Sequence, residues 1–364
     1  MNLDSFFDSL TDSRRFQGQR YPLSAVLWMF FLGKACGYHS SRRLAAFIEG
    51  ASSFFIPYFG LLHGVPCHVT LCRILTSLDT AEMCANFNLF VGSSVDLLPS
   101  DWVSGDGKAL RSTVVSGTTS EQNFGSMVSL FCDRLGLTCA LQDYQNKKVC
   151  EIDILRDLLP QIRGKGLMVT LDALHCQKKT AEAIVESGND YMLQAKDNQP
   201  KLVKHILACE AAGTPIDTCT VTEHSRGTDN TWEVSVYEPT DEDLKVTWKN
   251  LVTLVVIHKW VVEKDGKYIK TRHLYISSRN GLTAKQCAEG IRGHWGIENK
   301  LHWVKDVILN EDKNKIENVN TASNMAVINT MAINFLRKNV HHSITTAQIL
   351  FGQTFQNRIH EFRM

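Results

Sequence analysis

The chain has 364 residues, of which 44% are hydrophobic and 21% are charged, a composition typical of a globular protein with a large core. Lysine and arginine (39) nearly balance aspartate and glutamate (38), giving a net charge of +1. This balance argues against a protein that coats DNA along its length, although it allows a local basic groove. At this length, two or three domains are expected.

The cysteines and apolar runs bear on where the protein works. The chain contains 11 cysteines, an odd number, and no C-x-x-C pair, so neither a disulfide framework nor a zinc ribbon is indicated. Free thiols fit the reducing cytoplasm. The first residues do not resemble a secretory signal, and the apolar run AVLWMFFLG from Ala25 is about half the ~20 residues that a membrane span requires. We therefore expect a cytoplasmic protein with no membrane partner.

Residues 1–97 have the pattern of a small helical domain. Pro22 and Gly37 enclose an apolar stretch in the order that favours a helix between them, and further helical stretches follow. The domain is a candidate DNA reader in which arginines would contact phosphates, but arginines on a helix also commonly face solvent. These arginines are Arg42, Arg43 and Arg73.

From residue 98 the pattern changes to strands and helices. The predicted strands are WVSGD, the two halves of GSMVSLFCDRLGLTCALQDY, GLMVTLD and DYMLQAKD, and the predicted helices are EIDILRDLLPQI and TAEAIVESG. The order of three strands, helix, strand, helix and strand predicts a mixed α/β sheet with flanking helices, as in a ribonuclease-H-like core. We assign this core to residues 98–202 and 283–340, a β-rich insertion to 203–282, and a C-terminal tail to 341–364.

Three acidic residues lie where such a core could hold metal ions. Asp106 and Asp172 each end an apolar run, which predicts positions at the C-terminal tips of buried strands, and Glu298 lies in the helix-like stretch IRGHWGIENKLHWVKDV. Hard divalent cations prefer carboxylate ligands, and two such cations can activate a hydroxyl and stabilise a leaving oxygen in phosphodiester chemistry. Asp106 would bridge the two cations, and Asp172 and Glu298 would each complete one site.

Each of the three also has an ordinary explanation. Asp106 precedes a glycine, and Asp-Gly is a turn signal. Asp172 could cap the helix that follows it. Glu298 could be one of many glutamates on a solvated helix face.

The surroundings of Glu298 favour a functional helix face. At about 100° per residue, charged side chains fall on one face and an apolar stripe on another. Lys305 would lie two turns below Glu298, suited to a phosphate oxygen. A zinc site shared by the two histidines of this face is not expected, because they would be about 12 Å apart along the helix axis. The charged face consists of His294, Glu298, His302 and Lys305.

Five ordered motifs give the chain a family resemblance: DGKALR, TLDALHCQ, YMLQAKDNQPKL, YISSRNG and RGHWGIENKLHWVKDV followed by NED. Together with the N-terminal LTDSRRFQGQRYPLSAVL, they resemble the DDE transposases of bacterial insertion sequences, in particular the group of H-repeat-associated proteins. The resemblance covers about residues 8–338. The wider group carries a tyrosine and an arginine where this chain has Ile291 and His294.

The resemblance implies a ribonuclease-H-like core with a β-strand insertion before the glutamate. It implies that Asp106, Asp172 and Glu298 form the metal-binding triad, with Lys305 on the same catalytic helix. The cofactor would be Mg²⁺, for which Mn²⁺ could substitute. The partners would be double-stranded DNA, as terminal inverted repeats and as target, and further copies of the chain in a synaptic oligomer.

Basic residues and one tryptophan are candidates for contact with DNA. Trp232 in the insertion could stack on an unpaired base or be an ordinary core aromatic. The candidate DNA-binding residues are Lys108, Arg111, Lys178, Lys179, Lys196, Lys201, His294 and His302.

The sequence therefore predicts a transposase that cleaves DNA at transposon ends and transfers the 3′-hydroxyl end to target DNA, associated with the nucleoid when bound. Two alternatives stay open. One is a domesticated or inactive copy that binds DNA without cutting it. The other is a ribonuclease-H-like nuclease that does not transpose.

Overall fold

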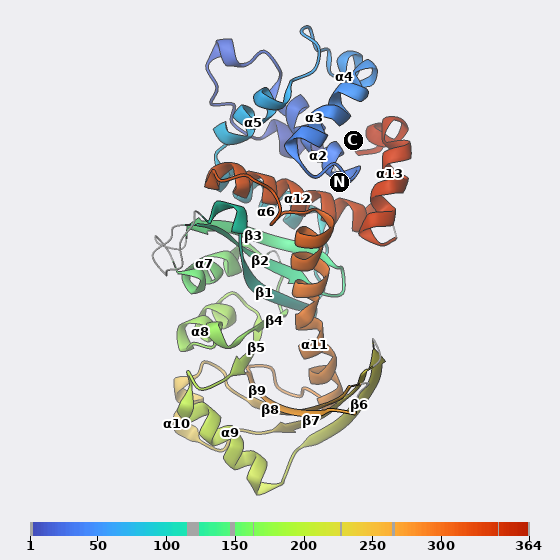
Figure 1. Cartoon of the computed structure of the whole chain (residues 1–364). Coiled ribbons are helices and arrows are strands. Elements are labelled where there is room, and N and C mark those ends of the chain that lie inside the picture. Colours follow the sequence, from blue (N-terminus) through green and yellow to red (C-terminus); the bar gives the residue numbers. More distant parts are fainter. Residues whose placement is uncertain are drawn as a thin grey trace.

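The computed structural model describes residues 3–114, 124–145, 150–162, 164–225, 228–263, 266–340 and 342–362. The chain forms an N-terminal layer of helices, a mixed sheet, and helices on both faces of the sheet (Figure 1). No helix in these ranges is both long enough and apolar enough to cross a membrane.

The N-terminal layer is built around α2, which begins directly after Pro22 and is buried along nearly its whole length. Side-chain caps define other helix starts: Ser40 accepts a hydrogen bond from the backbone N–H of Arg43, and Asp79 accepts from Ala81. The helices are α1 (Leu3–Asp8), α2 (Leu23–Ala35), α3 (Ser41–Gly50), α4 (Ser52–Phe59), α5 (His68–Ser77) and α6 (Thr80–Ser94).

Nine strands of the described residues form one sheet in the order β3-β2-β1-β4-β5-β9-β8-β7-β6. β1, β2 and β3 are antiparallel neighbours, whereas β4 and β5 run parallel to β1. This confirms the predicted α/β class with a mixed sheet. The strands are β1 (Trp102–Ala109), β2 (Gly125–Cys132), β3 (Leu137–Gln145), β4 (Met168–Leu171), β5 (Asp190–Ala195), β6 (Asp217–Ser225), β7 (Thr228–Tyr237), β8 (Thr253–Val262) and β9 (Tyr268–Ser277).

The β-rich insertion extends the sheet of the core. β9 pairs antiparallel with β5, so β6 to β9 continue the same sheet to its far edge (Figure 1). The expected boundary at residue 203 falls inside α9 (Pro200–Ala212), which packs against β8. A short helix, α10 (Glu242–Thr247), precedes β8.

Helices cover both faces of the sheet. On one face, α7 (Glu151–Leu158) and α8 (Lys178–Glu186) bury apolar side chains with β1, β4 and β5. On the other, α11 (Ala284–Gly296) packs against β1 and β4. Thr283 caps α11 in a capping box, as the sequence predicts. Because Asp106 and Glu298 come from β1 and from the continuation of α11, this packing sets their separation.

α12 (Val319–Asn339) lies between the N-terminal layer and the sheet (Figure 1). Buried asparagines fasten it to both sides. Asn324 donates to the carbonyl oxygens of Leu75 and Leu78, at 2.9 and 3.1 Å. Asn334 exchanges two hydrogen bonds with the backbone of Thr138 in β3, at 2.9 and 2.8 Å.

The expected C-terminal tail is instead a helix. α13 (Ile344–Arg358) begins at a Ser343 cap and packs against α2 and α12. Phe351 and Phe355 are buried in the same apolar cluster as the N-terminal helices. The helical layer is therefore assembled from both ends of the chain.

Candidate metal centre

Asp106 lies inside β1 rather than at its tip, because residues 106–109 continue to pair with β2. On the other side, the parallel pairing of β1 with β4 ends at Ser104 and Thr170. Two positions further along the same register come Asp106 and Asp172. The two aspartates therefore lie where β4 separates from β1, at the carboxyl end of the parallel strands.

The helix that carries Glu298 is not a regular α-helix. α11 continues into two π-helical segments, η5 (Ile297–His302) and η6 (Val304–Ile308). A π-helix has i→i+5 hydrogen bonds and is frequently found at functional sites. The charged helix face was predicted from a rotation of 100° per residue, and this rotation does not apply to the residues after Gly296.

Asp106, Glu298 and His302 meet in one cluster. A ligand atom from each lies within 4.8 Å of the other two. The His302 Nδ1 atom is 3.4 Å from Asp106 Oδ2 and 3.8 Å from Glu298 Oε2. Two carboxylates and an imidazole form a donor set that suits a divalent cation.

Burial also fits a cation here. The His302 side chain is only 8% exposed. The Glu298 side chain is 53% exposed, so the cluster is open on the helix side. The site thus combines a buried floor with access from solvent.

The electrostatics show that the centre lacks positive charge. Burial, followed by the nearby carboxylates of Glu298, Glu151 and Asp172, raises the pKa of Asp106 to about 8. The nearby imidazole of His302 lowers the pKa of Glu298, against the opposing effect of burial. Neighbouring carboxylates that repel one another favour binding of a cation.

Asp172 lies beside this cluster and also caps a turn. Its Oδ1 atom accepts from the backbone N–H of Leu174 and of His175, at 3.0 and 3.4 Å. The turn is η4 (Ala173–His175). The capping explanation therefore applies, without excluding a metal-binding role, because a carboxylate has further lone pairs.

Two groups near the site were not among the predicted site residues: Glu151, which the sequence analysis missed, and His175, for which packing or contact with DNA was expected. Glu151 is the first residue of α7, and its Oε1 atom lies 3.0 Å from Nε2 of the buried His175. Its Oε2 atom accepts from the hydroxyl of Tyr144 at 2.8 Å. An acidic residue in the first turn of a helix is common for reasons of helix stability alone, so the sequence gives no signal that distinguishes Glu151.

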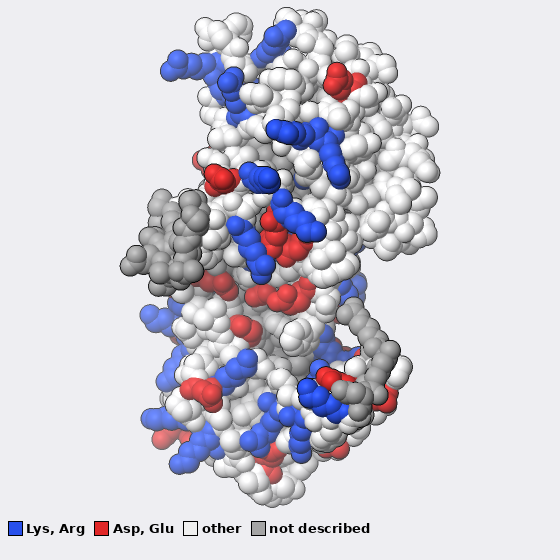
Figure 2. Space-filling model, viewed as in Figure 1, with Lys and Arg blue, Asp and Glu red and all other residues white. Residues whose placement is uncertain are grey.

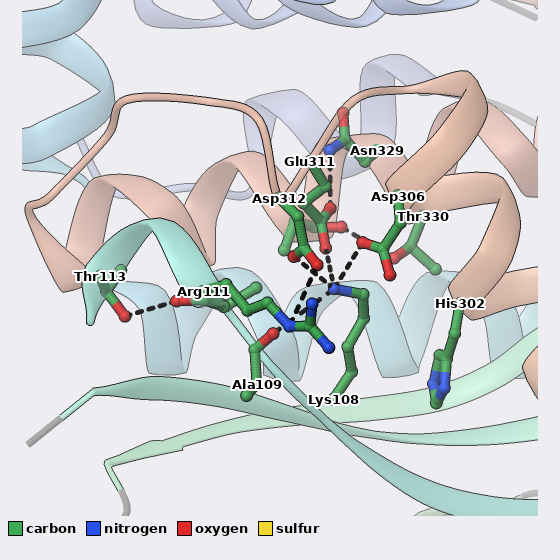
Figure 3. A network of polar contacts seen from close by, with 12 residues as sticks. Lys108, Ala109, Arg111, Thr113, His302, Asp306, Glu311, Asp312, Asn329 and Thr330 are labelled. Carbon is green, nitrogen blue, oxygen red and sulfur yellow. Dashed lines mark hydrogen bonds and ion pairs between the residues drawn. The ribbon is translucent and has the colours of Figure 1, made fainter. Parts of the chain in front are cut away.

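Lys108 lies in an ionic network with carboxylates that follow the helix of Glu298 (Figure 3). Lys108 is 8% exposed, and its Nζ atom is 2.7 Å from Asp306, 3.0 Å from Asp312 and 3.8 Å from Glu311. Lys305 is 1% exposed, and burial lowers its pKa while Glu311 opposes the shift. Neither lysine is placed to meet a DNA phosphate in this structure, in contrast to the expectation from the sequence.

Other predicted DNA contacts lie on the surface. Arg111 follows β1 and is 78% exposed, with Asp312 at 3.4 Å. Lys178 follows β4, and Lys196 and Lys201 follow β5; all three are exposed. Since β1, β4 and β5 are parallel, the residues that follow them lie toward the same end of the sheet as Asp172. Figure 2 shows acidic side chains across the middle of this view, with Lys and Arg above and below them.

The remaining candidates are more enclosed. His294 is half-buried; burial lowers its pKa, and the carboxylates of Asp172 and Glu298 act in the opposite direction. His302 is part of the acidic cluster. Trp232 is half-buried, and the guanidinium of Arg292 lies over its ring at 4.5 Å.

Two known protein families match this chain, one over its N-terminal residues and one over most of the remainder. Residues 112–335 match the family described as Transposase DDE domain, and residues 5–91 match the family described as DDE_Tnp_1-associated. The first match contains Asp172 and Glu298, whereas Asp106 precedes it.

Individual relatives cover nearly the whole chain. It is 30% identical to YbfL of Escherichia coli (strain K12) over 336 residues, 90% of this chain and 88% of that protein. The H repeat-associated protein YhhI of the same strain is 29% identical with the same coverage. YncI of Escherichia coli O157:H7 is 29% identical over 93% of this chain and 88% of its own length.

A solved piggyBac transposase synaptic complex with hairpin DNA has a TM-score of 0.45 and 11% identity, over 98% of this chain and 77% of that chain. The family assignment does not depend on this likeness. It follows from the sequence matches, and it agrees with the resemblance expected from the five motifs. The chain belongs to the family of transposases with a DDE domain, together with the H repeat-associated proteins among its relatives.

Proposed function

We propose that this protein cleaves DNA strands at the ends of its own element and joins the released 3′-hydroxyl to target DNA. The observation that supports this most strongly is the cluster of Asp106, Glu298 and His302, with Asp172 next to Asp106 in the register of the parallel strands. Carboxylates gathered around a strand and a helix suit metal-dependent phosphoryl transfer.

Each residue has a defined part in this proposal. Divalent cations bound here would lower the pKa of an attacking hydroxyl and stabilise the leaving 3′-oxygen. Asp106, Glu298 and His302 would hold a cation on the helix side, and Asp172 would add a ligand on the β4 side. The cation would be Mg²⁺, and the imidazole of His302 would suit Mn²⁺ as a substitute.

The proposed partners are double-stranded DNA and further copies of the chain. Arg111, Lys178, Lys196 and Lys201 are exposed around the edge that holds the acidic residues. Lysine and arginine at such positions bind the phosphate backbone of DNA without recognising the base sequence. We assign Lys108 and Lys305, which are buried, to holding the helix of Glu298 against β1.

The test is an assay of labelled DNA that carries the element's own ends, with Mg²⁺ or Mn²⁺. Native protein should produce cuts at the ends and joined products, and Glu298→Gln should produce neither. Glu289→Gln is the matched control, because Glu289 lies on the same helix and is exposed. It should behave as native protein.

Other outcomes would contradict the proposal in distinct ways. Tight binding to end DNA without cuts under either metal would indicate a DNA-binding copy. Cuts without joined products would indicate a nuclease. Equal activity of native protein and Glu298→Gln would remove Glu298 from the mechanism.

A further inference from the structure

The part of the sheet formed by β6 to β9 has two different faces. Residues directly opposite each other on neighbouring strands lie on the same face, so the pairing of Lys259 with Trp232 and with Thr271 places these three side chains in one row. Trp232 packs against the apolar cluster to which α11 contributes. We call this the α11 face. It is also the face of Asp106, because Asp106 and Trp102 lie on the same side of β1 and Trp102 packs against the same cluster.

Ion pairs neutralise charges on both faces of these strands. On the opposite face, which we call the α9 face, Glu210 of α9 lies 3.1 Å from Arg272. On the α11 face, Glu223 of β6 is paired with Arg292 of α11. Figure 1 shows α9 and α11 on opposite sides of this part of the sheet.

Two lysines of the α11 face have no such partner. Lys259 and Lys196 form no ion pair with a carboxylate in the described part of the chain. Lys196 follows Ala195, whose partner on β9 is Leu274, and it is therefore level with His273. Burial, followed by the charges of Lys259 and Lys196, lowers the pKa of His273, so both ammonium groups lie near one neutral imidazole. Positive charges gathered in this way without a counter-ion favour binding of an anion.

A chain of hydrogen bonds adds a further donor to this place. Nε2 of Gln194 lies 3.2 Å from Nδ1 of His273, and Nε2 of His273 lies 3.1 Å from the hydroxyl oxygen of Thr271. An amide nitrogen can only donate, so Nδ1 accepts and the neutral ring carries its hydrogen on Nε2. That hydrogen is donated to Thr271. The hydrogen of the Thr271 hydroxyl is then free to be donated to an anion, because this side chain is exposed.

We propose that Lys259, Lys196 and Thr271 bind a phosphate of the DNA backbone at a distance from the phosphate that is cut. The strands β9 and β8 are the third and fourth from β1 in the sheet order, which at about 4.8 Å per strand is about 14–19 Å from β1. At 3.4 Å per base pair, this corresponds to about four to six base pairs. This inference rests on the proposed function, because it assigns further contacts to the same DNA.

The test compares Lys259→Met with the matched control Lys270→Met in the full-length protein. Both lysines lie over a tryptophan ring, Lys259 at 5.5 Å from Trp232 and Lys270 at 5.2 Å from Trp260. Lys270 is next to Thr271 on β9 and therefore lies on the α9 face. Methionine keeps an apolar stem over the ring in both variants, so the two changes differ in the face from which a charge is removed.

Binding to DNA that carries the element's own ends is measured by fluorescence anisotropy over a range of salt concentrations. Each phosphate contact contributes about 0.9 to the slope of log affinity against log salt concentration. Lys259→Met should lose about this much of the native slope, so its deficit in affinity should shrink about eightfold for each tenfold rise in salt. Lys270→Met should keep the native slope.

A change in the DNA locates the contact. A methylphosphonate, which is an uncharged replacement for a phosphate, is placed about four to six base pairs from the cut. It should weaken binding by native protein and by Lys270→Met, and it should have little further effect on Lys259→Met. Thr271→Val should also weaken binding, and Thr271→Ser, which keeps the hydroxyl, should bind as native protein does.

Two results would overturn the inference and leave the proposed function standing. In the first, native protein cleaves end DNA while Lys259→Met binds it with native affinity and native slope. In the second, native protein cleaves end DNA while Lys270→Met loses as much affinity and slope as Lys259→Met. If native protein neither binds nor cleaves end DNA, the proposed function itself fails.

Discussion

Replacing Gly290 by alanine should disturb the contact that sets the distance between Asp106 and Glu298. Gly290 lies on α11, where an added Cβ atom would be 2.1, 2.2 and 2.3 Å from three ring atoms of Trp102. Trp102 is the first residue of β1, and its backbone is paired with Met168 of β4. Ordinary contact requires more than 1 Å of additional space, so either the ring or the helix must move.

The expected magnitude combines two opposing effects. Overpacking a filled interior lowers the free energy of unfolding by about 1–3 kcal/mol, whereas glycine to alanine within a helix raises it by up to about 1 kcal/mol. We expect a net loss of about 1–2 kcal/mol. A displacement of about 1 Å between catalytic groups can lower a rate about a hundredfold, so DNA cleavage should fall further than stability does.

Urea unfolding and the cleavage assay should be compared for Gly290→Ala and Gly352→Ala. Gly352 lies inside α13, and its added Cβ atom would meet Cys36 at an ordinary 3.7 Å. The control variant Gly352→Ala should have a free energy of unfolding about 0.5–1 kcal/mol higher than that of native protein, and it should keep the cleavage activity. If Gly290→Ala were as stable and as active as native protein, close packing of α11 on β1 would not set the geometry of the site.

Three further predictions concern buried polar groups. Lys108→Met leaves three carboxylates without the ammonium group that they share, and it should lower the free energy of unfolding, measured in urea, by about 3–5 kcal/mol. Arg111→Met, at an exposed ion pair, should change this free energy by at most about 1 kcal/mol. Equal losses of stability in the two variants would contradict the ionic network. Burial lowers the pKa of Lys34 to about 8, so in native protein this lysine loses its proton at a lower pH than in the unfolded chain. The contribution of Lys34 to the free energy of unfolding should therefore rise between about pH 8 and pH 10.5. The higher stability of Lys34→Met, measured by urea unfolding at each pH, should shrink over that interval. A difference in stability that is constant with pH would refute this. His302→Ala should weaken Mn²⁺ binding, measured by calorimetry, more than Mg²⁺ binding, because Mg²⁺ prefers oxygen ligands; equal losses would place His302 outside the coordination sphere.

The sequence was a good guide to the strands that carry the acidic residues. Continuous apolar runs mark buried strands whatever their neighbours are, so the positions of Asp106 and Asp172 beside a sheet could be predicted. Their proximity depends on strand order, which the pattern of alternating strands and helices indicated. The end of β1 was misjudged, because Asp106-Gly107 looks like a turn although β2 continues to pair beyond it.

Other features depend on tertiary contacts that leave no local pattern. The π-helical winding after Gly296 has no signal in residues that also suit an α-helix. Lys108 looked like a surface lysine, and its burial follows from carboxylates about 200 residues later in the chain. Neither α4, which contains Pro57, nor α13 was predicted, although aromatic residues of α13 fill the N-terminal core.

In the proposed reaction, a cation held at Asp106 contacts the phosphate that is cut. A single sulfur atom in place of a non-bridging oxygen at that phosphate tests it, because sulfur binds Mg²⁺ poorly and softer metals better. Native protein should cleave this substrate slowly with Mg²⁺, and Mn²⁺ should restore the rate by more than it changes the rate on ordinary DNA. Equal slowing of cleavage with both metals would contradict direct contact between the bound cation and the phosphate.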